Sequence, residues 1–314
     1  MKEKVAILMA AYNGEKYISE QIDSIIKQTY ANWVLFISDD GSTDRTMDIV
    51  SQYVEQYPDK IFVVPGEKEN HGAKENFDFL LQNVKGYQYY MFSDQDDVWL
   101  ENKINVLMKK MRQMEQEEGR NTPIMVFSDM KVVDSQLNII ADSFLKYSNL
   151  IWTNNILESY LLHNYTAGCS MLCNVSLINI TGNIPACAAM HDYWIALIAA
   201  SMGRIGFIKH AQVLYRQHEN NSVGASRWSP LNFLNSIKKE NIQKLQKEKQ
   251  MYKDMSAFFQ QMYGERMDVE SQKIVNSYIL FVEEKNIWKK VIWACKFQLY
   301  KTPNYFFMYM LNVQ

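Results

Sequence analysis

The sequence lacks the features that mark several large classes of protein. It has no run of eighteen uncharged apolar residues, so no segment is predicted to cross a membrane as a helix. The apolar run nearest the N-terminus, residues 5–11, is too short for a signal peptide's apolar core, and we expect a cytoplasmic location. The four cysteines lack the paired short spacing of a zinc site and are predicted to be reduced core thiols. A formal net charge of -2 provides no concentrated positive field, so nucleic acid is not an expected partner.

The charge that is present is unevenly distributed. Residues 227–314 hold 14 Lys and Arg against 8 Asp and Glu, whereas residues 1–226 hold 19 against 27. The basic part is mostly helical in pattern and becomes rich in aromatic residues toward its end. We therefore predict a catalytic domain over 1–226 and a helical C-terminal extension over 227–314. The extension's aromatic and basic residues suggest contact with a membrane surface, while packing on the core or forming a homodimer is the alternative.

Strand-like and helix-like segments alternate through the first hundred residues. The predicted strands cover Val5–Ala10, Trp33–Ser38, Ile61–Val64 and Tyr87–Phe92. The predicted helices between them cover Tyr17–Lys27, Thr43–Gln56 and Lys74–Asn83. This alternation predicts an α/β fold with a mainly parallel sheet covered by helices on both faces. In such sheets ligands bind beyond the carboxyl ends of the strands.

Three carboxylates lie at the end of the fourth predicted strand, at Asp94, Asp96 and Asp97. Carboxylates this close repel one another unless a cation or strong hydrogen-bond donors compensate them. Oxygen ligands of this kind suit Mg²⁺ or Mn²⁺, which would in turn bind diphosphate oxygens. The alternative is an acidic turn that caps the next helix.

A second acidic turn, Asp39–Asp40 followed by Gly41 and Ser42, comes after the second predicted strand. Tyr12 and Asn13 follow the first strand, so both groups are expected at the same edge of the sheet. A carboxylate can accept a hydrogen bond from a base or ribose, and a tyrosine ring can stack on a base. An ordinary strand-to-helix connection would use the same turn residues.

Two polar groups occur later in the chain. His191–Asp192 precedes an apolar helix, and Asp192 is either a helix cap or a general base that approaches from the acceptor side. Arg216 and His218 follow an apolar strand. Arg216 is suited to hold phosphate oxygens, and His218 to serve as a metal ligand or phosphate donor, although an isolated string of this kind also fits a solvated loop.

These motifs in this order resemble family 2 glycosyltransferases of the GT-A fold, and the resemblance covers roughly residues 4–225. The strings Ser93–Trp99 and Tyr215–Asn221 resemble most the bacterial branch that contains rhamnosyltransferases of cell-surface polysaccharide synthesis. The resemblance implies a single displacement that inverts the anomeric carbon. The Gln-x-x-Arg-Trp string of processive members is absent, which favours the addition of one or a few sugars.

Residue roles follow from the same resemblance. The expected nucleotide-sugar pocket comprises Tyr12 and Asp40 on the base, with Ala11, Asn13 and Asp39 around them. Asp96 is the expected direct ligand of Mg²⁺ or Mn²⁺, Asp94 contacts ribose or the metal through water, and Asp97 gives support or a second metal contact. Asp192 is the expected catalytic base.

The predicted function is transfer of a sugar, with dTDP-rhamnose as the favoured donor, to a hydroxyl of a glycan or lipid-linked acceptor. Two alternatives stand beside it. A nucleotidyltransferase would need a Gly-rich basic loop after the first strand, which Ala10–Gly14 does not provide. A noncatalytic sugar-nucleotide-binding protein would keep the fold without transfer. The tail segment Asn286–Lys296 is hypothesised to dock on the inner face of the membrane.

Overall fold

The computed structural model describes residues 3–66, 70–150, 152–153, 156–219, 239–299 and 303–310. Its strands are β1 (Val5–Ala11), β2 (Trp33–Asp39), β3 (Ile61–Val63), β4 (Tyr89–Ser93), β5 (Val98–Trp99), β6 (Ile124–Ser128), β7 (Lys131–Val133), β8 (Ile139–Ala141), β9 (Met171–Asn174), β10 (Arg204–Ile208) and β11 (Val213–Arg216). Its α-helices are α1 (Ile18–Ile26), α2 (Thr46–Gln56), α3 (Ala73–Asn83), α4 (Lys103–Glu118), α5 (Phe144–Tyr147), α6 (Ile156–Leu162), α7 (Val175–Thr181), α8 (His191–Met202), α10 (Lys239–Tyr263), α11 (Val269–Glu283), α12 (Ile287–Lys296) and α13 (Pro303–Met310).

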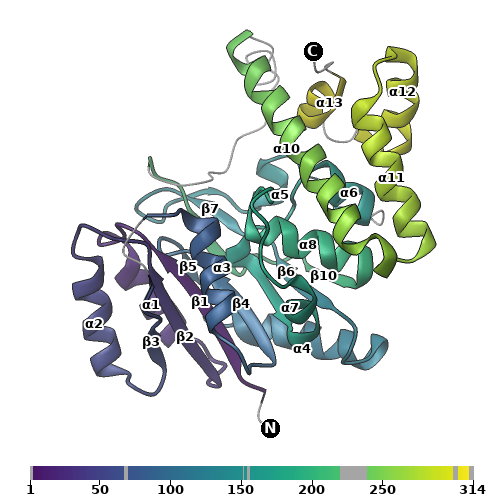
Figure 1. Cartoon of the computed structure of the whole chain (residues 1–314). Coiled ribbons are helices and arrows are strands. Elements are labelled where there is room, and N and C mark those ends of the chain that lie inside the picture. The colour runs from purple at the N-terminus through teal and green to yellow at the C-terminus, as the bar shows by residue number, and fades with distance from the viewer. Residues whose placement is uncertain are drawn as a thin grey trace.

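Seven strands form the main sheet in the order β10-β6-β9-β4-β1-β2-β3 (Figure 1). The pairs β1–β2, β1–β4, β2–β3 and β6–β10 are parallel, which confirms the predicted mainly parallel sheet. Ala11 pairs with Asp39 and Met9 with Ser93, so β1, β2 and β4 end at one edge. This register is why the polar groups after these three strands meet. The antiparallel strand β9, which lies between β4 and β6, was not predicted from the sequence.

A smaller sheet, in the order β5-β11-β7-β8, lies beside this edge. β5 begins one residue after Asp97 and pairs antiparallel with β11. The pairing brings Arg216, the last residue of β11, against the loop that carries the three aspartates. Two short strands therefore fix the relation between two motifs that are about 120 residues apart in the chain.

Alternate residues of β1 enter two hydrophobic clusters, one on each face of the sheet. Val5, Ile7 and Met9 belong to the cluster that includes apolar residues of α1 and α4. Ala6 and Leu8 belong to the other, which includes residues of α3 and α8. This alternation follows from the period of two of a strand, and it explains why β1 is apolar throughout rather than polar at every second position.

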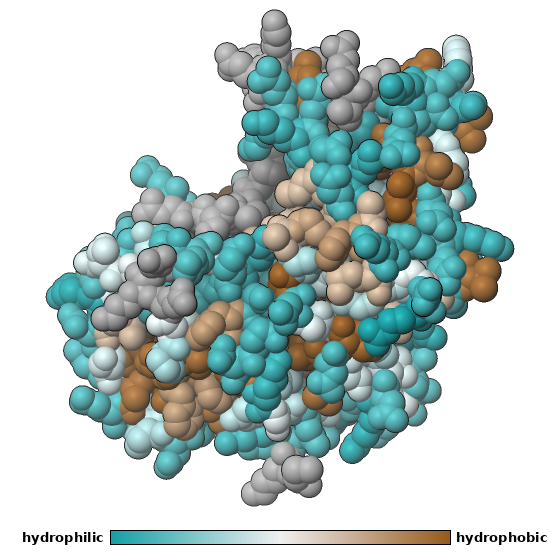
Figure 2. Space-filling view, in the orientation of Figure 1, coloured by the Kyte–Doolittle hydropathy of each residue, from teal (hydrophilic) through white to brown (hydrophobic). Residues whose placement is uncertain are grey.

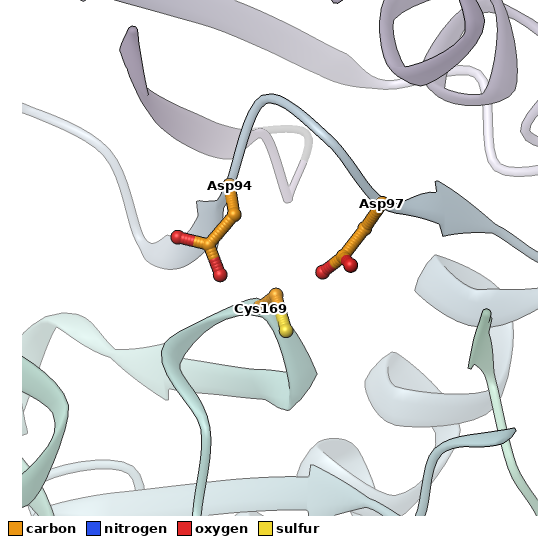
Figure 3. Close-up of side chains that lie close together, drawn as sticks. All are labelled: Asp94, Asp97 and Cys169. Atoms are coloured by element: carbon orange, nitrogen blue, oxygen red, sulfur yellow. The ribbon is translucent and has the colours of Figure 1, made fainter. Parts of the chain in front are cut away.

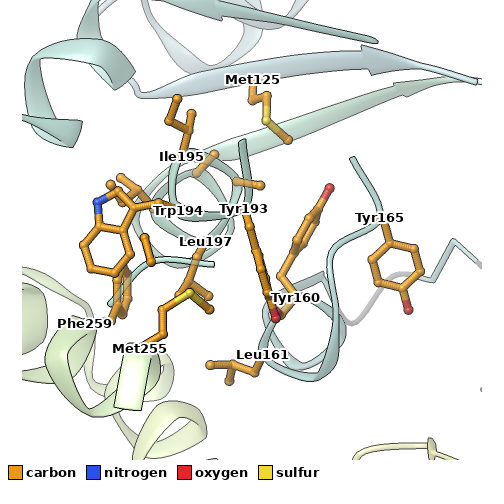
Figure 4. Packing of buried hydrophobic residues seen from close by; sticks show 14 of the residues in the cluster. Met125, Tyr160, Leu161, Tyr165, Tyr193, Trp194, Ile195, Leu197, Met255 and Phe259 are labelled. Carbon is orange, nitrogen blue, oxygen red and sulfur yellow. The ribbon is translucent and has the colours of Figure 1, made fainter. Parts of the chain in front are cut away.

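The C-terminal helices continue the second cluster. Trp194 of α8 packs on Phe259 of α10 with ring centroids 5.4 Å apart, and Met255 lies in the same group (Figure 4). α8 is buried almost all round because the sheet, α6 and α7 pack around it and Phe259 of α10 covers Trp194. The expected boundary at 226/227 lies outside the described residues, but the described part of the extension shares its core with the catalytic part. No described helix is long and apolar enough to cross a membrane.

Candidate active site

Loops at the carboxyl edge of the sheet surround a cavity of about 890 Å³. Its wall includes several of the predicted residues, which are Ala11, Tyr12, Asp40, Asp94, Asp96 and Asp192. The charged side chains among its described lining residues are all carboxylates, namely these four aspartates and Glu248, and none is Lys or Arg. The described wall is thus acidic throughout, with apolar and hydroxyl-bearing side chains between the carboxylates.

Asp40 is held in the cavity wall by the start of α3. Its Oδ1 accepts a hydrogen bond from the amide of His71 at 3.0 Å, and its Oδ2 accepts one from the amide of Gly72 at 2.8 Å. Gly72 has φ of +97°, a conformation that glycine adopts at little cost. Asp40 therefore has a fixed orientation in the cavity wall, which also includes Tyr12, a residue that is 41% exposed. The two residues stand where a base-recognition pocket was expected.

Asn13 and Asp39 are placed differently from Asp40 and do not line the cavity. The Oδ1 of Asn13 accepts a hydrogen bond from the amide of Thr43 at 2.8 Å. The carboxylate of Asp39 accepts hydrogen bonds from the amide and hydroxyl of Ser42, at 3.0 and 2.5 Å. The Asn13 side chain thus joins the loop after β1 to the loop after β2, whereas Asp39 orders the turn within the loop after β2. Direct contact of Asn13 and Asp39 with a nucleotide stays a prediction.

Gln95 connects the loop after β1 to the loop after β4. Its Oε1 accepts a hydrogen bond from the amide of Tyr12 at 2.9 Å, and its Nε2 donates one to the carbonyl of Tyr12 at 2.7 Å. The Gln95 amide thus forms the same pair of hydrogen bonds with the Tyr12 backbone that a residue of a neighbouring strand would form. This role of Gln95 was not predicted from the sequence, because the aspartates on either side of it were interpreted as the functional residues of the loop.

The three aspartates after β4 differ in their surroundings. Asp94 is half-buried in the cavity wall, and its enclosure raises its pKa to about 7, with the charges of Asp96 and Asp192 adding to the effect. Asp97 is fully buried and accepts a hydrogen bond from the amide of Arg216 at 3.0 Å. Burial, together with Asp96 and Asp94, raises the pKa of Asp97 well above its usual range. Asp94 and Asp96 face the cavity, whereas Asp97 supports the loop from beneath.

Cys169, in the segment before β9, lies opposite this loop. Asp94 and Asp97 both point toward its thiol, and one ligand atom from each of the three residues lies within 4.8 Å of the others (Figure 3). Burial and the two carboxylates raise the pKa of the thiol well above its usual value, so it stays protonated. A protonated thiol is a poor ligand for a hard cation. The oxygens of Asp94 and Asp96 therefore fit a divalent cation better than this buried triad does.

Arg216 does not stand where a phosphate ligand was expected. It is 1% exposed and is absent from the cavity wall. Its guanidinium donates to the carbonyl of Asp96 at 2.6 Å, to the carbonyl of Ser135 at 2.7 Å and to the carboxylate of Glu20. The prediction of direct phosphate contact is thus corrected: the side chain is directed into the protein, where it supports the aspartate loop.

His218 does lie next to a predicted metal ligand. Its Nε2 is 2.8 Å from Oδ2 of Asp96. Its ring stacks on Tyr17, with centroids 4.9 Å apart, and Arg216 lies against the same tyrosine. The arrangement is compatible with the predicted ligand role for His218, and it equally orients the Asp96 carboxylate.

Asp192 stands in the first turn of α8 and lines the same cavity as Asp94 and Asp96. Its Oδ1 accepts hydrogen bonds from the amide of Tyr193 at 2.5 Å and from Nδ2 of Asn164 at 3.1 Å. Its Oδ2 accepts one from the amide of Gly168 at 2.9 Å. Burial raises its pKa to about 6 even though these hydrogen bonds favour the charged form. A carboxylate with this pKa is ionised at neutral pH and is a stronger base than an exposed one.

The neighbouring His191 belongs to an aromatic cage rather than to the polar cluster. Its ring packs on Phe77 and Phe92, with centroid separations of 4.0 and 4.9 Å, and burial lowers its pKa to about 3. Gly168 is required by this packing, because a Cβ there would lie 2.7 Å from Nε2 of His191. The packing of Gly168 on His191 thereby fixes the position from which the Asp192 side chain points into the cavity.

Comparison with known proteins decides the family. The family model described as glycosyl transferase family 2 matches residues 6–117. The dTDP-rhamnosyl transferase RfbG of Shigella flexneri is 32% identical over 231 residues, which are 69% of this chain and 74% of that protein. The chain belongs to glycosyltransferase family 2.

Solved structures show the fold of this glycosyltransferase to be GT-A. TarS of S. aureus, solved in complex with UDP-GlcNAc, aligns with a TM-score of 0.58 at 16% identity over 98% of this chain and 89% of that chain. Mannosyltransferase PcManGT from Pyrobaculum calidifontis, in complex with GDP-Man and Mn2+, aligns with a TM-score of 0.53 at 14% identity over 98% and 86%. The family membership makes the protein a glycosyltransferase, and the nucleotidyltransferase alternative is set aside.

Several cavity residues of the glycosyltransferase were not found from its sequence. Asn164 lies in an irregular segment after α6, without a motif around it. Leu245, Glu248, Met251 and Tyr252 come from α10, in the extension that was assigned to membrane or subunit contact. The sequence of α10 mixes polar and apolar residues, and such a pattern does not indicate which face of the helix contacts a ligand.

Proposed function

We propose that this protein transfers a sugar, with inversion, from a nucleotide diphosphate donor to a hydroxyl of a glycan or lipid-linked acceptor in bacterial surface polysaccharide synthesis. The observation that carries the proposal is the presence, in one cavity, of Asp192 with a pKa of about 6 and the pair Asp94 and Asp96. A single displacement needs a base on the acceptor side and charge compensation on the leaving-group side.

In this mechanism Asp192 takes the proton of the acceptor hydroxyl as its oxygen attacks the anomeric carbon. The new carbon–oxygen bond forms while the bond to the diphosphate breaks, so no covalent intermediate with the protein is required. The hydrogen bonds from Asn164 and the amide of Gly168 hold the Asp192 carboxylate in one orientation. Tyr12 and Asp40 are the proposed contacts of the nucleotide base.

The acidic wall supports a requirement for a divalent cation. A nucleotide diphosphate brings further negative charge to described lining residues that include five carboxylates and no Lys or Arg. Asp94 and Asp96 would hold Mg²⁺ or Mn²⁺, with His218 beside Asp96 as a further ligand. When bound, the ion would neutralise the charge that develops on the leaving diphosphate.

The favoured donor is dTDP-rhamnose, in line with the name of the 32% identical relative. A thermal-shift screen with dTDP-rhamnose, UDP-glucose, UDP-GlcNAc and GDP-mannose, each with Mn²⁺ and with EDTA, tests both donor and metal. Stabilisation of about 2.7 kcal/mol is expected at a hundred times the dissociation constant. One donor should stabilise the protein with Mn²⁺ but not with EDTA, and Asp96→Ala should abolish the effect. No response to any donor with Mn²⁺ would favour a noncatalytic protein.

We propose further that α12 contacts an anionic membrane surface. Ile287, Trp288 and Ile292 are 50%, 77% and 69% exposed, and Lys285 and Lys289 lie exposed beside them. Figure 2 shows brown, apolar side chains among teal ones where Figure 1 places α11 and α12. Apolar residues flanked by lysines suit the boundary between headgroups and acyl chains.

Vesicle flotation of the full chain tests this membrane contact. The protein should float with phosphatidylglycerol vesicles and not with phosphatidylcholine vesicles, and a Trp288→Glu, Ile292→Glu double variant should stay at the bottom. Ile139→Glu, a comparable change at an exposed isoleucine of β8, is the matched control and should still float. If the double variant floats as well as the wild type, the proposal is wrong. If it instead turns a dimer into a monomer, α12 is a subunit contact.

A further inference from the structure

The C-terminal extension forms part of the cavity wall and does not only pack on the core. Leu245, Glu248, Met251 and Tyr252 of α10 line the cavity together with Met308 of α13. The first four lie at spacings of three, three and one along the helix, so they occupy one face of α10. That face is turned toward the cavity that holds Asp192.

A chain of contacts joins this face to the proposed catalytic base. The ring of Tyr252 packs edge-on against Tyr193, with centroids 5.5 Å apart. Tyr193 is the residue after Asp192, and its amide donates to the Asp192 carboxylate. The contact therefore sets α10 beside the base. The base must lie next to the hydroxyl that it deprotonates, so the α10 face belongs to the acceptor side.

Glu248 is the charged group of this face, and its neighbour orients it. The hydroxyl of Tyr252 donates to Oε1 of Glu248 at 2.9 Å. A carboxylate held in this way is suited to accept hydrogen bonds from sugar hydroxyls, and a tyrosine ring offers an apolar surface to a sugar ring. Leu245, Met251 and Met308 add apolar surface around the pair.

We propose that Glu248, oriented by Tyr252, recognises the hydroxyls of an uncharged acceptor sugar that carries an apolar group. This inference deepens the proposed function and depends on it for the assignment of Asp192 as the base. The wall disfavours an acidic acceptor sugar, since the carboxylate of such a sugar would meet Glu248 and Asp192, and the described lining residues include no Lys or Arg to pair with it. The apolar residues favour an acceptor sugar linked to an alkyl or polyprenyl chain.

Ligand-observed NMR measures acceptor binding without turnover. The probes are octyl glycosides of neutral sugars (rhamnose, glucose, galactose, N-acetylglucosamine) and octyl glucuronide, each with the full-length protein. At least one neutral glycoside should bind and the glucuronide should not. Glu248→Gln and Tyr252→Phe should each weaken the binding of that neutral glycoside by about tenfold or more, as expected for loss of a hydrogen bond to a charged group.

Asp254→Asn is the matched control, because Asp254 accepts from Gln250 in an exposed pair of the same spacing on α10 and does not line the cavity. It should bind acceptor as the wild type does. Equal binding by the wild type and Glu248→Gln, or tight binding of the glucuronide, would overturn the inference. Donor stabilisation in the thermal-shift screen is measured separately, so a failure of the proposed function is distinguishable from a failure of this one.

Discussion

Asn164 donates a hydrogen bond from Nδ2 to Oδ1 of Asp192 across 3.1 Å. This bond links an irregular segment after α6 to the first turn of α8. It favours the charged form of the carboxylate and opposes the effect of burial, which is the larger of the two. The pKa of about 6 is thus a balance between burial and three hydrogen-bonded partners.

Asp192→Asn should lower kcat by about 10²–10⁴-fold, the usual contribution of a positioned base. The carboxylate accepts a proton only when it is ionised, so wild-type kcat should fall as pH decreases through about 6. The variant should lose this acid limb while its thermal shift with donor and Mn²⁺ stays unchanged. The measurement is kcat between pH 4.5 and 8, and an unchanged acid limb in the variant would exclude Asp192 as the titrating base.

Asn164→Ala should move the acid limb to higher pH. Removing the donor takes away stabilisation of the charged carboxylate, so the pKa of Asp192 rises, by about one unit if the hydrogen bond contributes about 1.5 kcal/mol. Activity at pH 8 should change much less than activity at pH 6. A uniform loss of activity at every pH would instead indicate that Asn164 contacts the substrate or maintains the fold.

The alternation of strands and helices and the edge at which the motifs meet were predictable from the sequence. β1, β2 and β4 each have an apolar run that ends in polar residues, and parallel pairing then leaves one arrangement for those ends. The antiparallel strand β9 was not predictable, because MLCN is too short to be distinguished from other apolar pieces. The two-residue strand β5 has no pattern at all, although it positions Arg216.

Candidate site residues could be named from the sequence where the residue type itself suggests a chemical role. The aspartates at 94, 96 and 192 could be named because clustered or isolated carboxylates suggest metal binding and base catalysis. The phosphate contact predicted for Arg216 was wrong for the same reason, because a guanidinium can donate to phosphate oxygens or to buried carbonyl oxygens. Only the pairing of β5 with β11 decides between these two partners. Glu248 could not be distinguished from its neighbours, since the role proposed for it depends on how Tyr252 of α10 packs on Tyr193 of α8.

The corrected role of Arg216 predicts a loss of stability rather than a specific loss of donor affinity. Its guanidinium donates hydrogen bonds to the carbonyls of Asp96 and Ser135 and to the carboxylate of Glu20. The ammonium group of a lysine cannot reproduce this planar set of donors. Arg216→Lys should therefore lower the free energy of unfolding by about 2–4 kcal/mol, in the range of other broken buried polar networks. Urea unfolding measures it. Unchanged stability with a large loss of donor affinity would restore the phosphate-ligand interpretation.

Gly14 and Gln95 should behave as a coupled pair in donor binding. A Cβ on residue 14 would lie 2.2 Å from Oε1 of Gln95, so Gly14→Ala must displace the side chain that pairs with the backbone of Tyr12. Gln95→Ala removes the same pairing directly. Each single variant should weaken donor binding by about tenfold, because the loss of two hydrogen bonds, at roughly 0.7 kcal/mol each, leaves the Tyr12 loop less fixed.

The double variant tests whether these two effects share one cause. In Gly14→Ala, Gln95→Ala the new methyl group occupies space that Gln95 has left, so no clash remains. Its dissociation constant for donor, measured by calorimetry with Mn²⁺, should equal that of Gln95→Ala alone, which corresponds to a coupling energy of about 1–2 kcal/mol in the double-mutant cycle. Additive losses, about a hundredfold together, would mean that Gly14 acts on the donor independently of Gln95. In that case the hydrogen bonds between Gln95 and Tyr12 would not be what positions Tyr12 for the donor.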